Sequence, residues 1–571
     1  MKPKFSKLAA AMLAVGAAGS AQAVTENADG LGQALIYPYY NVNNNFQTNV
    51  HVVNTKNEYK IVKLRIRESG NSQDVLDFNI YMSPYDVWTG VIRNVDGKAN
   101  LTSNDNTCTL PANDAPVAFA TDAGTVTGVL NDPTSGWPMN TVYPDVDDSD
   151  AREGYIEVLE VGVIPDDTWV DMTGDGDTLD DGDRTVNSGL LHGSDGVPAD
   201  CSVVTSAWTN GVSAGGTGSA SVTTWGGMPD VAGLLGPTGG LYGHSIFLNV
   251  ASGAAYVAQA TAIDNWSIHD PAANADGTLT DFDQHYRPDD AVNFLLPSLA
   301  SGNVSSTLVV DPTTDSALSI TDWPAAVDAT LNDGDDNTPR SGTNPFPVAH
   351  VLQASAIVND FFIDPVYDGR TDWVVTFPMR KHGIFNGQYS ESCGDSGDAD
   401  GTSTGTTEGN DTCFKNQDDD VAISARPFDR EEQQPAPGGF GVSPVIGTPD
   451  TVLPREVNIL TFNGDSVLGS DEAVSVQLGT DFVDGWMMMT FNSKYCFTET
   501  QLSDGTADFG VSDGSEAGSN LTAQHNAQCG VPAIGFAALQ GNNPVGSSFG
   551  ETIDHRFVRN VTPNIGPGVP Q

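Results

Sequence analysis

The sequence predicts an all-β protein of several sandwich-like domains, with mainly antiparallel strands and very few helices. Apolar and polar residues alternate with period two through residues 49–92, a pattern typical of strands that bury one face. Aspartate far outnumbers glutamate, which favours turns and loops over helices. The chain also shows no regular alternation of strand and helix patterns, which would indicate a parallel α/β sheet.

Turn residues divide the alternating segment into strands and predict an immunoglobulin-like sandwich unit over residues 24–94. The turns are expected at 54–58, 68–73 and 83–86. We expect the apolar row of the second strand to be buried and its basic row to remain accessible. The basic row would then pair with nearby acids or dock against the acidic surface of another copy. The two rows are Val62, Leu64 and Ile66, and Lys63, Arg65 and Arg67.

Residues 1–23 have the pattern of a signal peptide. Three lysines precede an apolar stretch from Leu8 to Ala18, and Ala21-Gln22-Ala23 supplies a cleavage signal. The apolar stretch is too short for a transmembrane helix, and no later apolar run reaches spanning length. We therefore expect an exported protein that is extracellular, at the cell surface or in the periplasm.

The chain is strongly acidic, with a formal net charge of −50. Such a field repels nucleic acids and anionic membrane surfaces, so nucleic acid is not an expected partner. The charge suits surroundings rich in divalent cations, or it serves solubility alone.

Six cysteines, an even number, predict disulfides in an exported chain. No C-x-x-C spacing occurs, which argues against zinc and redox-active sites. Pairing neighbours along the sequence gives the simplest connectivity. Those pairs are Cys108 with Cys201, Cys393 with Cys413, and Cys496 with Cys529.

Residues 95–390 are expected to form one or more central β domains with acidic loops. Strands are expected at 154–163 and 371–378, and a hairpin over 241–264 that turns at Ser252-Gly253. One helix is expected over 348–362, because apolar residues repeat there at intervals of three and four.

The last part of the chain divides into two regions. Residues 391–455 should hold an acidic disulfide loop followed by a proline-rich linker. Residues 456–571 should form a C-terminal β region, with strands at 456–462, 482–491 and 531–539.

The strongest chemical signal is an acidic loop at 171–183. Oxygen-bearing side chains alternate there with Gly176 at the sixth position, as in an EF-hand calcium loop. Gly182 stands where that loop needs a bidentate acid, and no helices flank it, so the loop is either a calcium site of another type or a solvated turn. The candidate calcium ligands are Asp171, Thr173, Asp175, Asp177, Asp180, Asp181 and Asp183.

Three serines lie in segments that resemble hydrolase nucleophile motifs. Ser213 fits G-x-S-x-G, Ser396 resembles the chymotrypsin-like segment, and Ser466 resembles the GDSL esterase block. None has the sequence context that its mechanism requires, such as a strand, elbow and helix around Ser213. We therefore assign no catalytic residue.

Histidines and tryptophans offer weaker signals. No two histidines lie three or four residues apart, which excludes a metal pair on a helix, and strand-borne His51 and His244 are expected to be packed or to line a surface. Some tryptophans could line a sugar site or be buried in sandwich cores. These are Trp169, Trp208, Trp225, Trp266 and Trp323. Among so many acids, carboxylate pairs for glycoside hydrolysis stay an alternative.

Strand sequences along the chain include LIYPYYNV, NVHVVNT, GYIEVLEVG and TDWVVTFP. They resemble those of large exported surface proteins of Gram-negative bacteria. The resemblance is spread over the mature chain and implies an extracellular or surface location. It carries no catalytic residues with it.

The sequence therefore predicts a secreted or cell-surface structural or adhesive protein without catalytic activity, with calcium as a candidate stabilising ion. The alternative is a secreted hydrolase or a carbohydrate-binding protein that acts on extracellular polymers. Expected partners are another copy of the chain, an extracellular glycan or a surface. A convergent cleft with paired carboxylates or a Ser-His-Asp set would favour the hydrolase.

Overall fold

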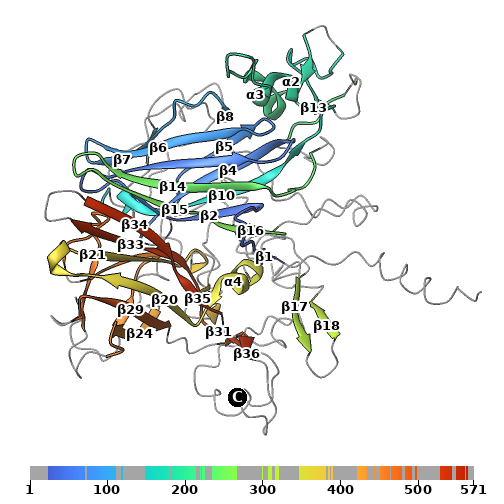
Figure 1. The fold of residues 1–571 in the computed structure, drawn as a ribbon. Helices are drawn as coiled ribbons and strands as arrows, with labels where there is room; N and C mark the ends of the chain where they lie inside the picture. The colour runs from blue at the N-terminus through green and yellow to red at the C-terminus, as the bar shows by residue number, and fades with distance from the viewer. Residues whose placement is uncertain are drawn as a thin grey trace, which may run out of the picture.

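The protein is built mainly of antiparallel β-sheets, as expected, which form two sandwiches stacked one above the other (Figure 1). The structure is a computed structural model. The residues that it describes are 24–70, 72, 74–110, 117–119, 148–179, 182–213, 219, 221–225, 234–266, 299, 306–311, 316–320, 346–380, 384–385, 388–389, 421–433, 441–443, 451–462, 464–478, 482–491, 496–497, 527–542, 548–559 and 561–562.

The first sandwich packs two antiparallel sheets face to face. In spatial order, the first sheet contains β1 (Thr25–Glu26), β16 (Thr261–Asp264), β2 (Ala34–Asn41), β10 (Glu153–Ile164), β4 (Tyr59–Glu68), β5 (Asp74–Met82) and β8 (Cys108–Leu110). The second sheet contains β15 (Ala254–Gln259), β14 (Leu241–Asn249), β3 (Gln47–Asn54), β6 (Val87–Val95), β7 (Lys98–Thr102) and β9 (Val117–Ala118).

The strands follow the expected local pattern but pair over long distances. The turns after β3, β4 and β5 and the β14–β15 hairpin lie where the sequence predicts them. However, β10 and β14 lie in the middle of the two sheets together with strands of residues 24–94. The unit that carries the first sandwich core therefore extends from residue 24 to residue 266.

The apolar row of β4 is buried, as predicted. Val62, Leu64 and Ile66 are at most 1 % exposed and pack against Leu76 and Phe78 of β5, among others, in the core of the first sandwich. Burial of such a row contributes roughly 2 kcal/mol for each large side chain.

The prediction that the basic row of β4 is accessible is wrong. Lys63, Arg65 and Arg67 are at most 2 % exposed. Strand β10 places Glu157 opposite Arg65, and the Glu157 carboxylate accepts a hydrogen bond from Arg67 Nε at 2.7 Å. The second sandwich also packs on this face, where Tyr155 of β10 joins a core shared by both sandwiches. These residues therefore cannot form an exposed surface for docking another copy.

A small subdomain caps one end of the first sandwich (Figure 1). Its core combines Ile61, Tyr81 and Trp225 with residues of two short helices. It contains β12 (Arg184–Thr185), β11 (Trp169–Val170), β13 (Val212–Ser213), α2 (Val186–Leu190) and α3 (Ser202–Thr209). The predicted disulfide between Cys108 and Cys201 is present and ties this cap to β8.

The other predicted disulfides stay predictions. Strands β30 (Cys496–Phe497) and β31 (Ala527–Cys529) place Cys496 directly opposite Cys529 in an antiparallel pair, a register compatible with the expected bridge. Cys393 and Cys413 lie outside the described residues.

The second sandwich also packs two sheets. In spatial order, one contains β26 (Thr451–Leu453), β24 (Val421–Asp429), β29 (Asp484–Phe491), β20 (Ala356–Phe362) and β35 (Arg556–Val558). The other contains β25 (Gly441–Ser443), β28 (Val474–Gln477), β27 (Val457–Phe462), β21 (Arg370–Thr376), β33 (Ile534–Asn542) and β34 (Ser548–Asp554), with one parallel pair between β27 and β28.

Short elements complete the described fold. The remaining strands are β17 (Ser306–Asp311), β18 (Ser316–Ile320), β19 (Gln353–Ala354), β22 (Ile384–Phe385), β23 (Gln388–Tyr389), β32 (Val531–Pro532) and β36 (Val561–Thr562). The remaining helical elements are the 3₁₀ turns η2 (Asp150–Arg152) and η4 (Pro365–Tyr367) and the short helix α4 (Phe346–Leu352).

The helix predicted over 348–362 is wrong in its second half. Helix α4 ends at Leu352, and β20 follows from Ala356. In β20 alternate residues Ile357 and Phe361 are buried, while Asp360 between them is exposed. The apolar residues of this segment fit both the helical and the strand period, and pairing with β29 and β35 selects the strand.

The two sandwiches share a buried interface. Phe247 of β14 stacks on Phe536 of β33 with ring centroids 5.7 Å apart, and the Thr376 hydroxyl donates to the Pro38 carbonyl at 2.6 Å. These contacts fix the second sandwich, and with it the cleft at its end, against the first.

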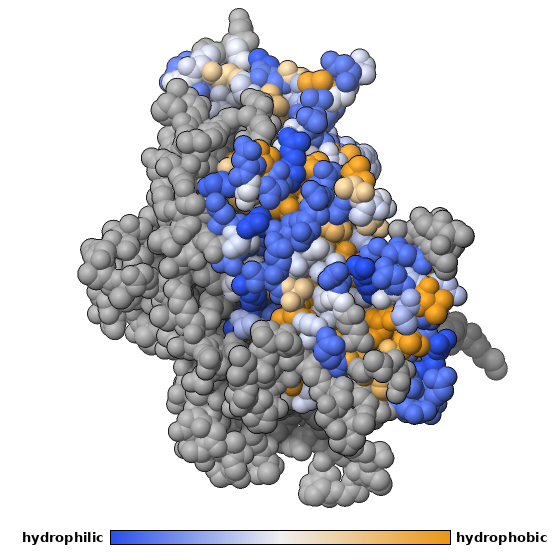
Figure 2. Space-filling view, turned by 90° about the vertical axis from the view of Figure 1, so that its left-hand side faces the viewer, coloured by the Kyte–Doolittle hydropathy of each residue, from blue (hydrophilic) through white to orange (hydrophobic). Residues whose placement is uncertain are grey.

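On the side shown in Figure 2, hydrophobic residues of the described surface lie in separate patches among hydrophilic ones.

Candidate functional site

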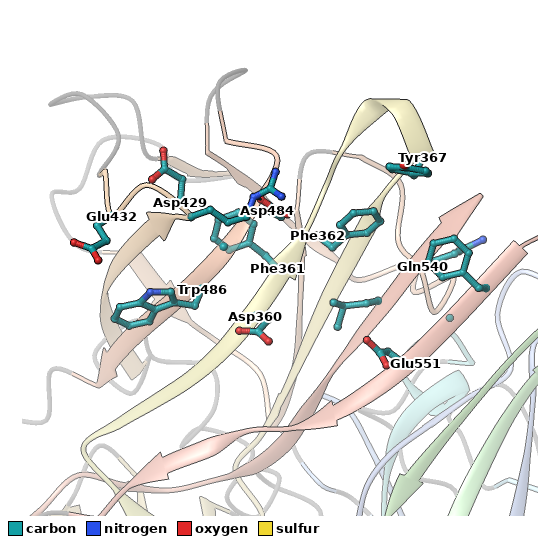
Figure 3. Close-up of a pocket in the computed structure, with 15 residues that line it drawn as sticks. Asp360, Phe361, Phe362, Tyr367, Asp429, Glu432, Asp484, Trp486, Gln540 and Glu551 are labelled. Atoms are coloured by element: carbon teal, nitrogen blue, oxygen red, sulfur yellow. Dashed lines mark ion pairs between the residues drawn. The ribbon is translucent and has the colours of Figure 1, made fainter. Parts of the chain in front are cut away.

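A cleft of about 960 Å³ opens at one end of the second sandwich (Figure 3). Residues from β20, β24, β29, β33 and β34 line it, together with η4. Its size suits a small ligand or a few residues of a polymer. The lining residues are Asp360, Phe361, Phe362, Tyr367, Asp429, Arg430, Glu432, Asp484, Gly485, Trp486, Leu539, Gln540, Phe549, Gly550 and Glu551.

Three aromatic rings in the cleft are unusually exposed. Tyr367 is 43 %, Trp486 39 % and Phe549 56 % exposed. Trp486 stacks on Phe428 of the neighbouring strand with ring centroids 4.6 Å apart, which supports the indole from behind. Large apolar rings held at a cleft surface lose little conformational entropy when a ligand covers them.

Two glycines shape the aromatic walls. A Cβ on Gly485 would lie 2.0 Å from the Phe428 carbonyl oxygen, so only glycine allows β29 to approach β24 there. A Cβ on Gly541 would lie 2.3 Å from the Phe549 ring. Phe549 is the cross-strand partner of Gly541, and its ring lies over the space that a larger residue would fill.

Local turn chemistry places Tyr367. Asp364 accepts a hydrogen bond from the Val366 amide at 2.8 Å, and Pro365 begins the helical turn η4. Aspartate before proline is a favoured start for such a turn. The turn brings Tyr367 beside Phe362, with ring centroids 6.3 Å apart.

Carboxylates dominate the polar part of the cleft. Five acids and one arginine line it. Figure 3 shows Asp429, Glu432 and Trp486 on one side, Tyr367, Gln540 and Glu551 on the other, and Asp360 between. The cleft therefore has many hydrogen-bond acceptors and an excess of negative charge.

Asp484 and Arg430 form an ion pair at the cleft, with Arg430 Nε 2.5 Å from a carboxylate oxygen. Burial raises the pKa of Asp484, Arg430 opposes that shift, and Asp364 adds to it. Asp429 is held differently, because its carboxylate accepts hydrogen bonds from the Glu431 and Gln433 amides at 3.0 and 2.7 Å. Asp429 thus stabilises the turn that carries Arg430.

The acidic loop at 171–183 lies in the cap of the first sandwich, away from this cleft. Asp171 is buried, and its carboxylate accepts hydrogen bonds from the amides of Thr173, Gly174 and Gly176 at 3.0, 2.6 and 2.9 Å. Burial alone would raise the pKa of Asp171, but these amides hold it below its ordinary value.

The other candidate calcium ligands are spread along the same loop. Asp183 accepts from the Met172 amide at 2.9 Å, whereas Thr173 and Asp175 are exposed and Asp177 is partly exposed. Asp180 and Asp181 lie outside the described residues. Within the described part of the chain, no three His, Cys, Asp or Glu side chains are gathered as a metal site. Calcium binding stays a prediction.

The structure places two of the three candidate serines in hydrogen bonds. Ser466 Oγ donates to the buried Asp372 carboxylate at 2.6 Å. Ser213 Oγ lies 2.7 Å from the Thr178 hydroxyl in a buried position. Neither hydroxyl has a histidine among its hydrogen-bond partners at described residues, and Ser396 lies outside them.

The tryptophans named from the sequence do not form the cleft. Trp208, Trp225 and Trp266 are buried, Trp169 is half-buried, and Trp323 lies outside the described residues. Sequence reasoning missed Trp486. Alternation along β29 is the signal that could have identified it. Met487 and Met489 are buried, so Trp486, next to Met487, faces outward.

Comparisons of the chain with protein-family models, curated proteins and solved structures find no match. Among the helices at described positions, none is long and apolar enough to cross a membrane.

Proposed function

We propose that the protein is an exported, surface-located adhesive protein that binds an extracellular glycan in the cleft of the second sandwich. The observation that carries the proposal is the set of exposed rings of Tyr367, Trp486 and Phe549 around a cleft rich in acceptors. Single exposed apolar residues are ordinary, but three in one cleft indicate a contact surface.

Sugar rings match this combination of groups. The C–H faces of a pyranose ring pack on an aromatic ring, while its hydroxyl groups donate hydrogen bonds around the edge. Asp360 and Glu551 supply carboxylate acceptors, and the Gln540 carboxamide can both donate and accept. The apolar walls would provide most of the affinity, and the polar groups would provide selectivity.

A glycan array probed with the mature full-length chain tests this proposal. An oligosaccharide that binds there is then titrated calorimetrically into wild type, Trp486→Ala and Phe549→Ala. Each substitution should weaken binding by about 2 kcal/mol, or roughly 30-fold, as for other aromatic anchors at binding sites.

Tyr85→Ala provides the matched control, because Tyr85 is an aromatic residue 68 % exposed on the first sandwich. It should leave glycan affinity unchanged. Equal losses in all three variants, or no binding to any glycan, would exclude the cleft as a glycan site. Release of reducing ends from the bound oligosaccharide would instead identify the alternative, a hydrolase.

A further inference from the structure

Two histidines meet on the outer face of the second sheet of the first sandwich. His51 of β3 and His244 of β14 are direct cross-strand partners in the antiparallel register. Their rings are stacked, with centroids 4.5 Å apart and planes inclined by 10°. Both side chains are partly exposed, so the pair is open to a ligand from solution.

The backbone beneath this pair is held firmly. Along β14, Leu241, Gly243 and Ser245 face the core, so His244 faces outward by alternation. The Tyr37 hydroxyl, which comes from the other sheet, donates to the His51 carbonyl at 2.7 Å. The spacing of the two imidazoles is therefore set by the ladder and fixed from behind.

From this geometry we infer that His51 and His244 form a binding site for a borderline divalent transition-metal ion such as Zn²⁺ or Cu²⁺. Imidazole nitrogen is a preferred ligand of both ions. Nitrogen atoms that share a tetrahedral ion lie about 3.3 Å apart, given a metal–nitrogen distance of about 2.0 Å. The rings reach this separation by turning about their last side-chain torsion, which is a soft motion for histidine.

Polar residues flank the pair in the same row of the sheet. Gln259 is the cross-strand partner of His244 on one side, and Thr89 is that of His51 on the other. Water would complete the coordination, as it does at zinc sites that keep an open position.

Calorimetric titration of Zn²⁺ into the untagged mature chain tests this site. Millimolar Ca²⁺ and Mg²⁺ in the buffer occupy the many acidic side chains, because carboxylates prefer these hard cations. Imidazole binds the same two ions only weakly, so they leave the histidine pair free for Zn²⁺. We expect one Zn²⁺ per chain. Loss of an outer-shell partner of a metal ligand typically lowers metal affinity 10- to 100-fold. His51→Gln and His244→Gln each remove a ligand itself, so each should weaken Zn²⁺ binding by more than that.

His192→Gln is the control, because the His192 ring pairs with the Ser83 hydroxyl at 2.9 Å in another part of the first sandwich. It should bind Zn²⁺ as wild type does. Electron paramagnetic resonance of Cu²⁺-loaded wild type gives a readout that does not depend on variants, and coupling to two imidazole nitrogens is expected. Coupling to fewer nitrogens, absence of a one-to-one event, or unchanged Zn²⁺ binding in the His51→Gln, His244→Gln double variant would overturn the proposal.

Discussion

At the scale of single residues, polar groups that suggest chemistry in the sequence often hold the backbone in the structure. The Asp372 carboxylate accepts hydrogen bonds from Ser466 Oγ, Thr461 Oγ and the Leu468 amide. Burial raises the pKa of Asp372, and these three donors oppose the shift. The Ser466 hydroxyl thus helps to satisfy a buried carboxylate, and that carboxylate anchors the segment after β27.

Ser466→Ala should therefore destabilise the protein without affecting binding in the cleft. Losing one donor to a buried carboxylate costs about 1.5–3 kcal/mol. Urea unfolding followed by tryptophan fluorescence measures the effect. Ser202→Ala, at an exposed serine that bonds Asp200, should change stability by less than about 0.5 kcal/mol. A loss of hydrolytic activity in Ser466→Ala at unchanged stability would contradict this assignment.

At the scale of elements, the sequence predicts strands well and their partners poorly. Alternation places β3 to β6 and the β14–β15 hairpin, because burial of one face is a local property of a strand. Pairing of β4 with β10 is not local. It depends on Glu157 meeting Arg65 and Arg67 across the ladder, and this pairing is why the basic row is buried rather than accessible.

The cleft could not be predicted for a related reason. Tyr367, Trp486 and Phe549 lie in three separate segments, and only the folded second sandwich brings them together. The histidine pair is similar, because β3 and β14 become neighbours only through long-range pairing. The predicted helix fails over 356–362, where two periods fit one short segment and tertiary pairing decides.

The disulfide between Cys108 and Cys201 should stabilise the cap strongly. It spans 93 residues, and loop-closure entropy for a span near 100 residues is worth about 4–5 kcal/mol. The double variant Cys108→Ala, Cys201→Ala isolates this bridge from the other cysteines, and its thermal unfolding should begin at lower temperature. Unchanged unfolding of the variant would show that packing of α2 and α3 alone holds the cap.

The loop at 171–183 yields a second element-scale prediction. If it binds calcium, EDTA should lower the melting temperature and Ca²⁺ should restore it, with Mg²⁺ less effective because it demands tighter octahedral geometry. Asp175→Ala should abolish the response, since one lost carboxylate leaves too few ligands. Asp175 is exposed, and its carboxylate accepts a hydrogen bond from the Asp177 amide at 3.3 Å, so the substitution should cost little stability by itself. A wild type indifferent to EDTA would leave Asp171 as a cap of a solvated turn.

At the scale of the whole molecule, the two sandwiches are joined by buried polar groups as well as by apolar contacts. Glu153 of β10 accepts hydrogen bonds from the Tyr39 hydroxyl, the Ser470 hydroxyl and the Asp471 amide at 2.8, 2.8 and 2.9 Å. Arg455 reaches Asp150 at 3.1 Å from the other side. Such groups stabilise the interface only while their protonation states match it.

Glu456 makes this interface sensitive to pH. It is fully buried, and burial raises its pKa from 4.5 to about 8, against the opposing effect of nearby Arg380. Between pH 4.5 and pH 8 the folded state therefore binds a proton that the unfolded state has released. The contribution of this proton to the free energy of unfolding is fully present below pH 4.5. It is lost as pH rises from 4.5 through 8, by at most about 1.4 kcal/mol per pH unit.

Glu456→Gln, which keeps the neutral form at all pH values, isolates this contribution. Its free energy of unfolding should fall less than that of wild type between pH 5 and pH 8.5, as measured by urea unfolding at each pH. Glu431→Gln, at an exposed position, controls for the loss of one charge and should follow the wild-type curve. If Glu456→Gln is instead less stable than wild type by the same free energy of unfolding at every pH, Glu456 is ionised throughout and stabilises the interface as the partner of Arg380.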